Sequence, residues 1–237
     1  MPRRVHVLFY CVLILAATAT PVFGKRRAAR PLTGLPEIQR VVIVILENAD
    51  LAQAQVQPYL SYLTRHGALL TNYHAVAHPS QPNYIALTAD DTYGITSDSP
   101  VSINAIHIGD LLDASQLQWR VYAENYPGDC FLGEYSGNPQ TGQYERKHTP
   151  FMSYIDVTQD TQRCSGAIVN ATGFDADVYT NNLPQLSFYI PNSYNDGHET
   201  SLAFADAWLL RTIEEIFHVG TLRQRDDTAT PISGIWR

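Results

Sequence analysis

The chain has 237 residues, of which 45% are hydrophobic, and its 16 basic and 23 acidic residues give a net charge of −7 with histidine neutral. An acidic balance of this kind argues against nucleic acid or an anionic membrane surface as the partner. It leaves small anionic substrates open, because these respond to local fields, and the length allows one domain with a sizeable core.

The first 24 residues have the pattern of a secretory signal peptide. Arg3 and Arg4 precede an apolar run from Val7 to Ala19, and small residues near Gly24 offer a cleavage site. The run is shorter than the roughly 20 residues that a membrane span requires. We therefore expect a secreted or periplasmic protein without a stable membrane anchor. Without Arg3 and Arg4, 14 basic residues face 23 acidic ones, a net charge of −9.

The remainder divides into a basic, proline-containing leader at 25–40, expected to be flexible, a domain at 41–222 and a divergent tail at 223–237. Within the domain, patterns of strand and helix alternate. The predicted strands are 41–46, 69–73, 119–123 and 186–190, and the predicted helices are 58–66, 80–89, 106–117 and 201–217. The first strand is a continuous β-branched run, typical of a strand buried on both faces. The alternation predicts an α/β fold, with a doubly wound, mostly parallel sheet and helices on both faces.

Residues 125–150 are rich in Gly, Pro, Asn and Tyr and are predicted to form a long loop. Cys11 leaves with the signal peptide, so Cys130 and Cys164 remain as a pair in an oxidising compartment, and a disulfide is expected. Asn170 begins a glycosylation sequon that is meaningful only in a eukaryotic host.

The heptapeptide HPSQPNY, from His78 to Tyr84, predicts a serine at the start of a helix. Pro82 is tolerated only in a first helical turn, and Ser80 is a favourable N-cap. One interpretation is an ordinary capped helix. The other is a nucleophile, because unpaired N–H groups and the helix dipole at this position favour a phosphate or an alkoxide.

Polar residues also follow the first and last predicted strands, and the carboxyl ends of parallel strands meet at one edge of a sheet. Glu47 and Asn48 end the first strand, where Glu47 could bind a metal or cap the next helix. Asp196 and His198 follow the last strand, where they could belong to a site or to a simple turn. Combined with Ser80, these residues fit metal-assisted phosphoryl transfer.

Two further histidines lie where they could contribute: His78 beside Ser80, and His148 in the long loop, from which it could reach an oxyanion. A serine hydrolase triad is the rival interpretation. It is ranked lower because the chain has no G-x-S-x-G elbow.

Taken together, these motifs resemble the acid phosphatase/phospholipase C-type phosphoesterase family, relatives of the alkaline phosphatase superfamily. The resemblance covers roughly 41–222, and the motifs in order are the strand into Glu47-Asn48, HPSQPNY with IALTADDTYGIT, KHTPF, and FYIPNSYNDGHETS with ADAWL. It implies an alkaline phosphatase-like fold, a small phosphate-ester substrate and a divalent metal ion of unknown identity.

By position, the resemblance makes Glu47 and Asn48 metal ligands and Ser80 the nucleophile, with its oxygen also near the metal. His148 and His198 match histidines that hold or protonate the phosphate. Asn83 and His78 are assigned to substrate binding and Asp196, more weakly, to the metal; Asp98 matches a polar position near the site.

Two features depart from the family pattern. Ala89-Asp90-Asp91 stands where relatives have small residues and glycine, and the segment after Leu222 lacks the apolar strand with an acidic end that relatives carry. We therefore expect one or more C-terminal strands, and part of the metal site, to be missing. Two hypotheses follow: a secreted phosphoesterase, or a non-catalytic protein of the same fold that binds phosphate-like ligands without turnover.

Overall fold

The computed structural model describes residues 38–47 and 49–217, with side chains described up to residue 213. The predicted signal peptide, most of the leader, the divergent tail and Asn48 lie outside the described residues.

Six strands are present in the described ranges, all of them short. They are β1 (Val41–Val44), β2 (Trp119–Ala123), β3 (Tyr135–Asn138), β4 (Gly142–Glu145), β5 (Ile168–Asn170) and β6 (Leu186–Ile190). The α-helices are α1 (Leu51–Gln55), α2 (Pro58–His66), α3 (Gln81–Ala89), α4 (Ile108–Ala114), α5 (Ile155–Thr158), α6 (Thr161–Ala167), α7 (Phe174–Tyr179) and α8 (Leu202–Phe217). Three short 3₁₀ helices are η1 (Arg146–His148), η2 (Pro150–Ser153) and η3 (Ala171–Gly173).

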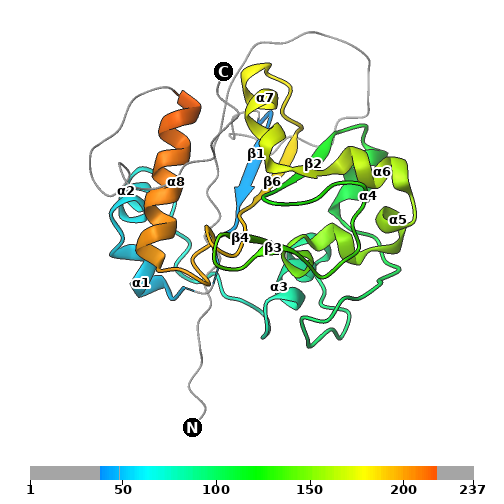
Figure 1. Ribbon diagram of the computed structural model, residues 1–237, viewed down its shortest axis with the longest axis horizontal. Helices are drawn as coiled ribbons and strands as arrows, with labels where there is room; N and C mark the ends of the chain where they lie inside the picture. The colour runs from blue at the N-terminus through cyan, green and yellow to red at the C-terminus, as the bar shows by residue number, and fades with distance from the viewer. Residues whose placement is uncertain (1–37, 48, 218–237) are drawn as a thin grey trace.

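Four of the strands form one parallel sheet in the order β1-β6-β2-β5. Helices α1, α2 and α8 lie on one side of this sheet and α3 to α6 on the other (Figure 1). The predicted α/β fold with a mostly parallel sheet is therefore confirmed. The sequence analysis predicts that one or more C-terminal strands are missing. The segment concerned, after Leu222, lies outside the described residues.

The period-two alternation of side chains along the strands produces two separate apolar layers. Tyr122 and Tyr189 face Trp208 of α8 and Leu60 of α2. On the opposite face, Val121, Phe188 and Ile190 pack with Tyr84, Ile85, Phe151 and Tyr154. Because both faces are covered, helices approach the sheet from both sides and can contribute side chains at its carboxyl edge.

Helices α2, α3 and α8 follow the predicted ranges closely, whereas α4 is shorter than predicted. The predicted strand at 69–73 is wrong, because this segment is irregular and Leu70 is 64% exposed. A strand there would need a neighbouring strand and an apolar face to cover Leu70, and the described residues supply neither at this place.

The predicted long loop is partly regular, since it contains the antiparallel hairpin β3–β4. Gly137 and Gly142 of this hairpin have φ values of +98° and +127°, which only glycine adopts readily. The predicted disulfide between Cys130 and Cys164 is present, with 5.8 Å between the two Cα atoms, and it ties this region to α6. In the described part of the chain, no helix combines the length and apolarity that crossing a bilayer requires.

Candidate active site

Glu47 lies just beyond β1, at the edge of the sheet where the parallel strands end. Glu47 is 2% exposed, and its backbone N–H donates to the carbonyl of Asp196, 2.9 Å away, in the segment that follows β6. The expected convergence of the two strand ends is therefore observed. The alternative role for Glu47, a helix cap, is not what the structure shows, because Asp50 forms the capping box of α1.

Ser80 immediately precedes α3, but its side chain makes no capping hydrogen bond. Its Oγ instead donates to Oε2 of Glu47 at 3.0 Å. The backbone N–H of Gln81, the first residue of this helix, donates instead to Oδ1 of Asp98 at 2.9 Å. Asp98 thus does the capping that the sequence assigned to Ser80, and the half-buried serine hydroxyl is free to face the carboxylate.

His148, at the end of η1, is buried between two carboxylates. Its Nε2 lies 3.8 Å from Oε1 of Glu47, and its Nδ1 lies 3.8 Å from Oδ2 of Asp196. Burial lowers the pKa of His148, while the charge of Glu47 opposes that shift. The imidazole is consequently favoured in its neutral form, which can donate at one nitrogen and accept at the other.

Asp196 is 1% exposed, and its two oxygens differ in their surroundings. Oδ1 accepts from the backbone N–H of His198 at 2.8 Å, whereas Oδ2 is buried without a hydrogen-bond partner. Burial raises the pKa of the Asp196 carboxyl well above its ordinary value, and the charge of Glu47 acts in the same direction. A buried carboxylate oxygen without a donor requires a proton or a cation.

The other predicted site residues lie around this centre. The imidazole of His198 is 35% exposed and contacts Oε1 of Glu199 at 2.8 Å, and His78 is exposed in the segment before Ser80. The amide of Asn83 bonds the backbone of that same segment, accepting from Val76 and Ala77 at 2.9 Å each. In this structure Asn83 therefore shapes the segment that leads into Ser80, and its predicted role in substrate binding stays a prediction.

Two residues near the site, Tyr84 and Lys147, were not singled out from the sequence. Tyr84 donates to Oε1 of Glu47 at 2.6 Å. Nζ of Lys147 lies 3.3 Å from Oδ2 of Asp98 and 2.9 Å from Oε2 of Glu145. A cation therefore lies beside the start of α3 that Asp98 caps. The HPSQPNY motif contains Tyr84, and KHTPF begins with Lys147, so motif membership was the available signal.

A third residue that the sequence did not reveal is Glu124, which directly follows β2 and is buried. It accepts from the backbone N–H of Asn192 at 2.9 Å, from Nδ2 of Asn195 at 2.7 Å and from the hydroxyl of Tyr189 at 3.2 Å. Glu124 thereby holds the segment that carries Asp196 and His198. Its position after a buried strand is the same signal that drew attention to Glu47.

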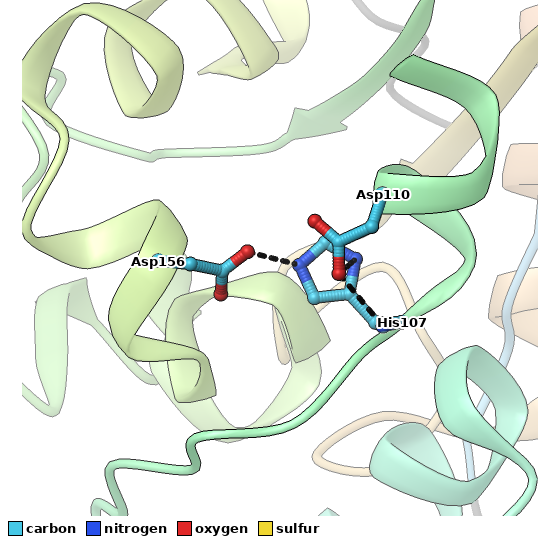
Figure 2. Close-up of side chains that lie close together, drawn as sticks. All are labelled: His107, Asp110 and Asp156. Atoms are coloured by element: carbon cyan, nitrogen blue, oxygen red, sulfur yellow. Dashed lines mark hydrogen bonds and ion pairs between the residues drawn. The ribbon is translucent and has the colours of Figure 1, made fainter. Parts of the chain in front are cut away.

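A separate group of metal-ligand types is formed by His107, Asp110 and Asp156, whose ligand atoms lie within 4.8 Å of one another (Figure 2). Arg163 already donates to Asp110 at 2.6 Å and also to Asp156, so a cation is in place. Nδ1 of His107 accepts from the N–H of Gly109, which puts the ring proton on Nε2, facing Asp156. We therefore interpret the group as an ion-pair cluster.

This cluster is also remote in the fold from the Ser80 centre. The His107 ring packs edge-on against Trp119, the first residue of β2, whereas Glu47 and Glu124 follow the last residues of their strands. The two groups therefore lie at opposite ends of the sheet.

Comparisons with known proteins agree with the resemblance seen in the motifs. The phosphoesterase family model matches residues 51–221, a segment that includes Ser80, His148 and Asp196, with Glu47 just before it. An acid phosphatase of Aspergillus fumigatus is 38% identical over 223 residues, which cover 87% of this chain and 50% of that protein. A phosphate-repressible acid phosphatase of Penicillium chrysogenum is 35% identical over 206 residues, covering 84% and 50%.

A bacterial relative is covered more completely. The phosphatidylinositol-3-phosphatase of Mycobacterium tuberculosis is 32% identical over 215 residues, which cover 88% of this chain and 68% of that protein. The chain spans about half the length of the fungal relatives it matches. The family model matches most of this chain, and the bacterial relative is similar over two thirds of its own length. The chain therefore belongs to the phosphoesterase family.

Proposed function

We propose that this protein hydrolyses phosphate esters, with Ser80 as the nucleophile. The observation that carries the proposal is the contact between Oγ of Ser80 and Oε2 of Glu47, at 3.0 Å, at the start of α3. A serine that merely capped its helix would turn its oxygen toward the helix N–H groups. Here Asp98 caps the helix, and the hydroxyl meets a carboxylate that can accept its proton.

In the first step, Oγ of Ser80 attacks phosphorus and forms a P–O bond as the ester P–O bond breaks. Its proton passes toward Glu47, the acceptor already in place. The departing alkoxide needs a proton, which the partly exposed His198 could deliver from the solvent side. Water then cleaves the phosphoserine, which releases phosphate and restores the hydroxyl.

His148 has a different role in this proposal. Because burial favours its neutral form, it is suited to hydrogen bonding with a phosphoryl oxygen or with the Glu47 and Asp196 carboxylates rather than to supplying a fixed positive charge. Lys147 lies beside Asp98, the carboxylate that caps α3, and offsets its negative charge near Ser80.

A divalent metal ion fits the donor set at this edge. Glu47, Asp196 and Ser80 offer oxygen ligands of the kind hard cations prefer, and Oδ2 of Asp196 is buried without a donor. Two buried carboxylates would repel a phosphate anion unless they were neutralised. We propose that Glu47, Asn48, Asp196 and the Ser80 hydroxyl hold the ion, although Asn48 lies outside the described residues. When bound, such an ion lowers the pKa of the serine hydroxyl and neutralises phosphate oxygens.

The direct test is hydrolysis of p-nitrophenyl phosphate by the purified chain, with and without a chelator. Ser80→Ala should lower turnover by at least about 10³-fold, as expected for loss of a nucleophile. Ser99→Ala is a matched control, since that exposed serine contacts Gln81 only through its backbone carbonyl. Equal activity of the Ser80→Ala variant and the wild type would contradict the mechanism, and vanadate binding without turnover would indicate a non-catalytic phosphate-binding protein.

The substrate class proposed is a small phosphate ester, in keeping with the acid phosphatase and phosphatidylinositol-3-phosphatase among the relatives. We also propose that the protein is secreted, on the basis of the signal-peptide pattern in residues 1–24 and the disulfide, which forms in oxidising compartments.

A further inference from the structure

Tyr84 contacts two of the predicted site residues at once, although neither proposed chemical step uses it. It lies four residues after Ser80, and this spacing brings both side chains to neighbouring positions on the same face of the helix. Its side chain is fully buried, its hydroxyl contacts Glu47, and its ring stacks on His148 with centroids 5.0 Å apart and planes inclined by 20°.

The contacts of Glu47 divide between its two oxygens. Oε2 accepts from Ser80, while Oε1 accepts from Tyr84 at 2.6 Å, a length typical of a hydroxyl bonded to a charged oxygen. Oε1 also faces Nε2 of His148 at 3.8 Å, beyond hydrogen-bond distance. Without the tyrosine hydroxyl, rotation of the carboxylate toward His148 would be the nearest way to satisfy Oε1.

We propose that Tyr84 is a positioning residue that fixes the rotation of the Glu47 carboxylate, so that Oε2 stays on the Ser80 hydroxyl and Oε1 stays off His148. The functional consequence rests on the phosphoesterase activity proposed above, but the positioning itself is a property of the chain alone. The ring contributes separately, since its face limits how far the His148 imidazole can tilt.

The test is a crystal structure of Tyr84→Phe without added metal, beside the wild type. We expect the Glu47 carboxylate to rotate, with Oε1 approaching Nε2 of His148 to hydrogen-bond distance and Oε2 leaving Ser80. Tyr154→Phe is the matched control, because that buried hydroxyl bonds Thr88 on the same helix, at 3.0 Å, without touching Glu47. Near-UV circular dichroism of both variants reports whether the aromatic core is intact.

Two solution measurements connect the positioning to function. Residues that orient a metal ligand or catalytic group typically contribute about 10- to 100-fold to affinity or activity. We expect Tyr84→Phe to lower kcat and Mn²⁺ affinity, measured by calorimetry, within that range, while KM stays near the wild-type value and Tyr154→Phe changes neither quantity.

The outcomes separate this proposal from the proposed activity. A wild-type chain without turnover contradicts the activity, and the crystal structures still decide the role of Tyr84. A Glu47 carboxylate that keeps its position in Tyr84→Phe overturns the proposal whatever the kinetics show. Rotation of that carboxylate in Tyr84→Phe, with no rotation in Tyr154→Phe, supports the proposal.

Discussion

Two substitutions of Glu124 should show how much of its effect on stability comes from accepting hydrogen bonds and how much comes from its charge. Glu124→Ala leaves three donors unsatisfied: the buried N–H of Asn192, the buried hydroxyl of Tyr189 and the partly buried Nδ2 of Asn195. Each such donor costs about 1–3 kcal/mol. Burial raises the pKa of Glu124, because the negative charge is unfavourable in the buried site. Removing that charge offsets part of the cost, so we expect the summed loss for the three donors to lie near the lower limit of this range.

We therefore expect Glu124→Ala to lower the free energy of unfolding by about 3 kcal/mol, or the melting temperature by about 6–12 °C for a chain of this length. Glu124→Gln should cost much less. Its carbonyl can replace Oε2, which accepts two of the three bonds, and its amide can donate to Tyr189.

The charge predicts a further difference between wild type and Glu124→Gln. Because the pKa of Glu124 is raised in the folded state, the folded protein retains this proton where the unfolded chain has lost it. The wild type is therefore stabilised at low pH and loses that contribution as the pH rises through the raised pKa. Glutamine does not titrate, so its stability relative to the wild type should improve between pH 4 and 7, values near and above the ordinary glutamate pKa.

Urea denaturation of the three proteins at both pH values measures these quantities. A loss below about 1 kcal/mol for Glu124→Ala, or an equal loss for the alanine and glutamine variants, would refute the assignment of Glu124 as the acceptor that holds this segment.

Two further predictions concern the rest of the fold. Burial lowers the pKa of His107, so its contribution to stability is complete above about pH 6.5 and declines as the pH falls below that value. The variant His107→Asn keeps an acceptor for the N–H of Gly109 and should show a smaller decline. Denaturation curves at pH 7.5 and 5.5, about one unit either side of the ordinary histidine pKa, measure the difference. The disulfide closes a loop with a sequence separation of 34, so the double variant Cys130→Ser, Cys164→Ala should lose about 3–4 kcal/mol of unfolding free energy in the chain-entropy description, and an unchanged urea midpoint would contradict this value.

Periodic patterns identified those elements whose apolar residues meet the core. The β-branched run of β1, the strands β2 and β6, and the amphipathic helix α8 each bury apolar residues in the core, among them Val42, Val121, Phe188 and Trp208. The segment 69–73 also contains apolar residues, but none of the strands in the described ranges pairs with it, so local composition alone gave a wrong prediction there. Short elements such as α1 and β5 depend on tertiary contacts and left too few residues for a periodicity to appear.

The site was predictable to the extent that parallel topology brings strand ends together. Placing Glu47 and Asp196 side by side needed only the fold class and their positions after two strands. Which residue caps α3 could not be predicted, because Asp98 lies 17 residues away in an irregular segment. The contact of Tyr84 with Glu47 joins residues 37 apart and depends on the packing of α3 against the sheet.

In the proposed mechanism, Oγ of Ser80 is the nucleophile that accepts the phosphoryl group from the substrate. The most direct measurement is peptide mass spectrometry after acid quenching during turnover of p-nitrophenyl phosphate. We expect a phosphoryl group on Ser80, absent in Ser80→Ala and in substrate-free protein. Turnover accompanied by no phosphoserine, or by phosphate on another residue, would contradict it.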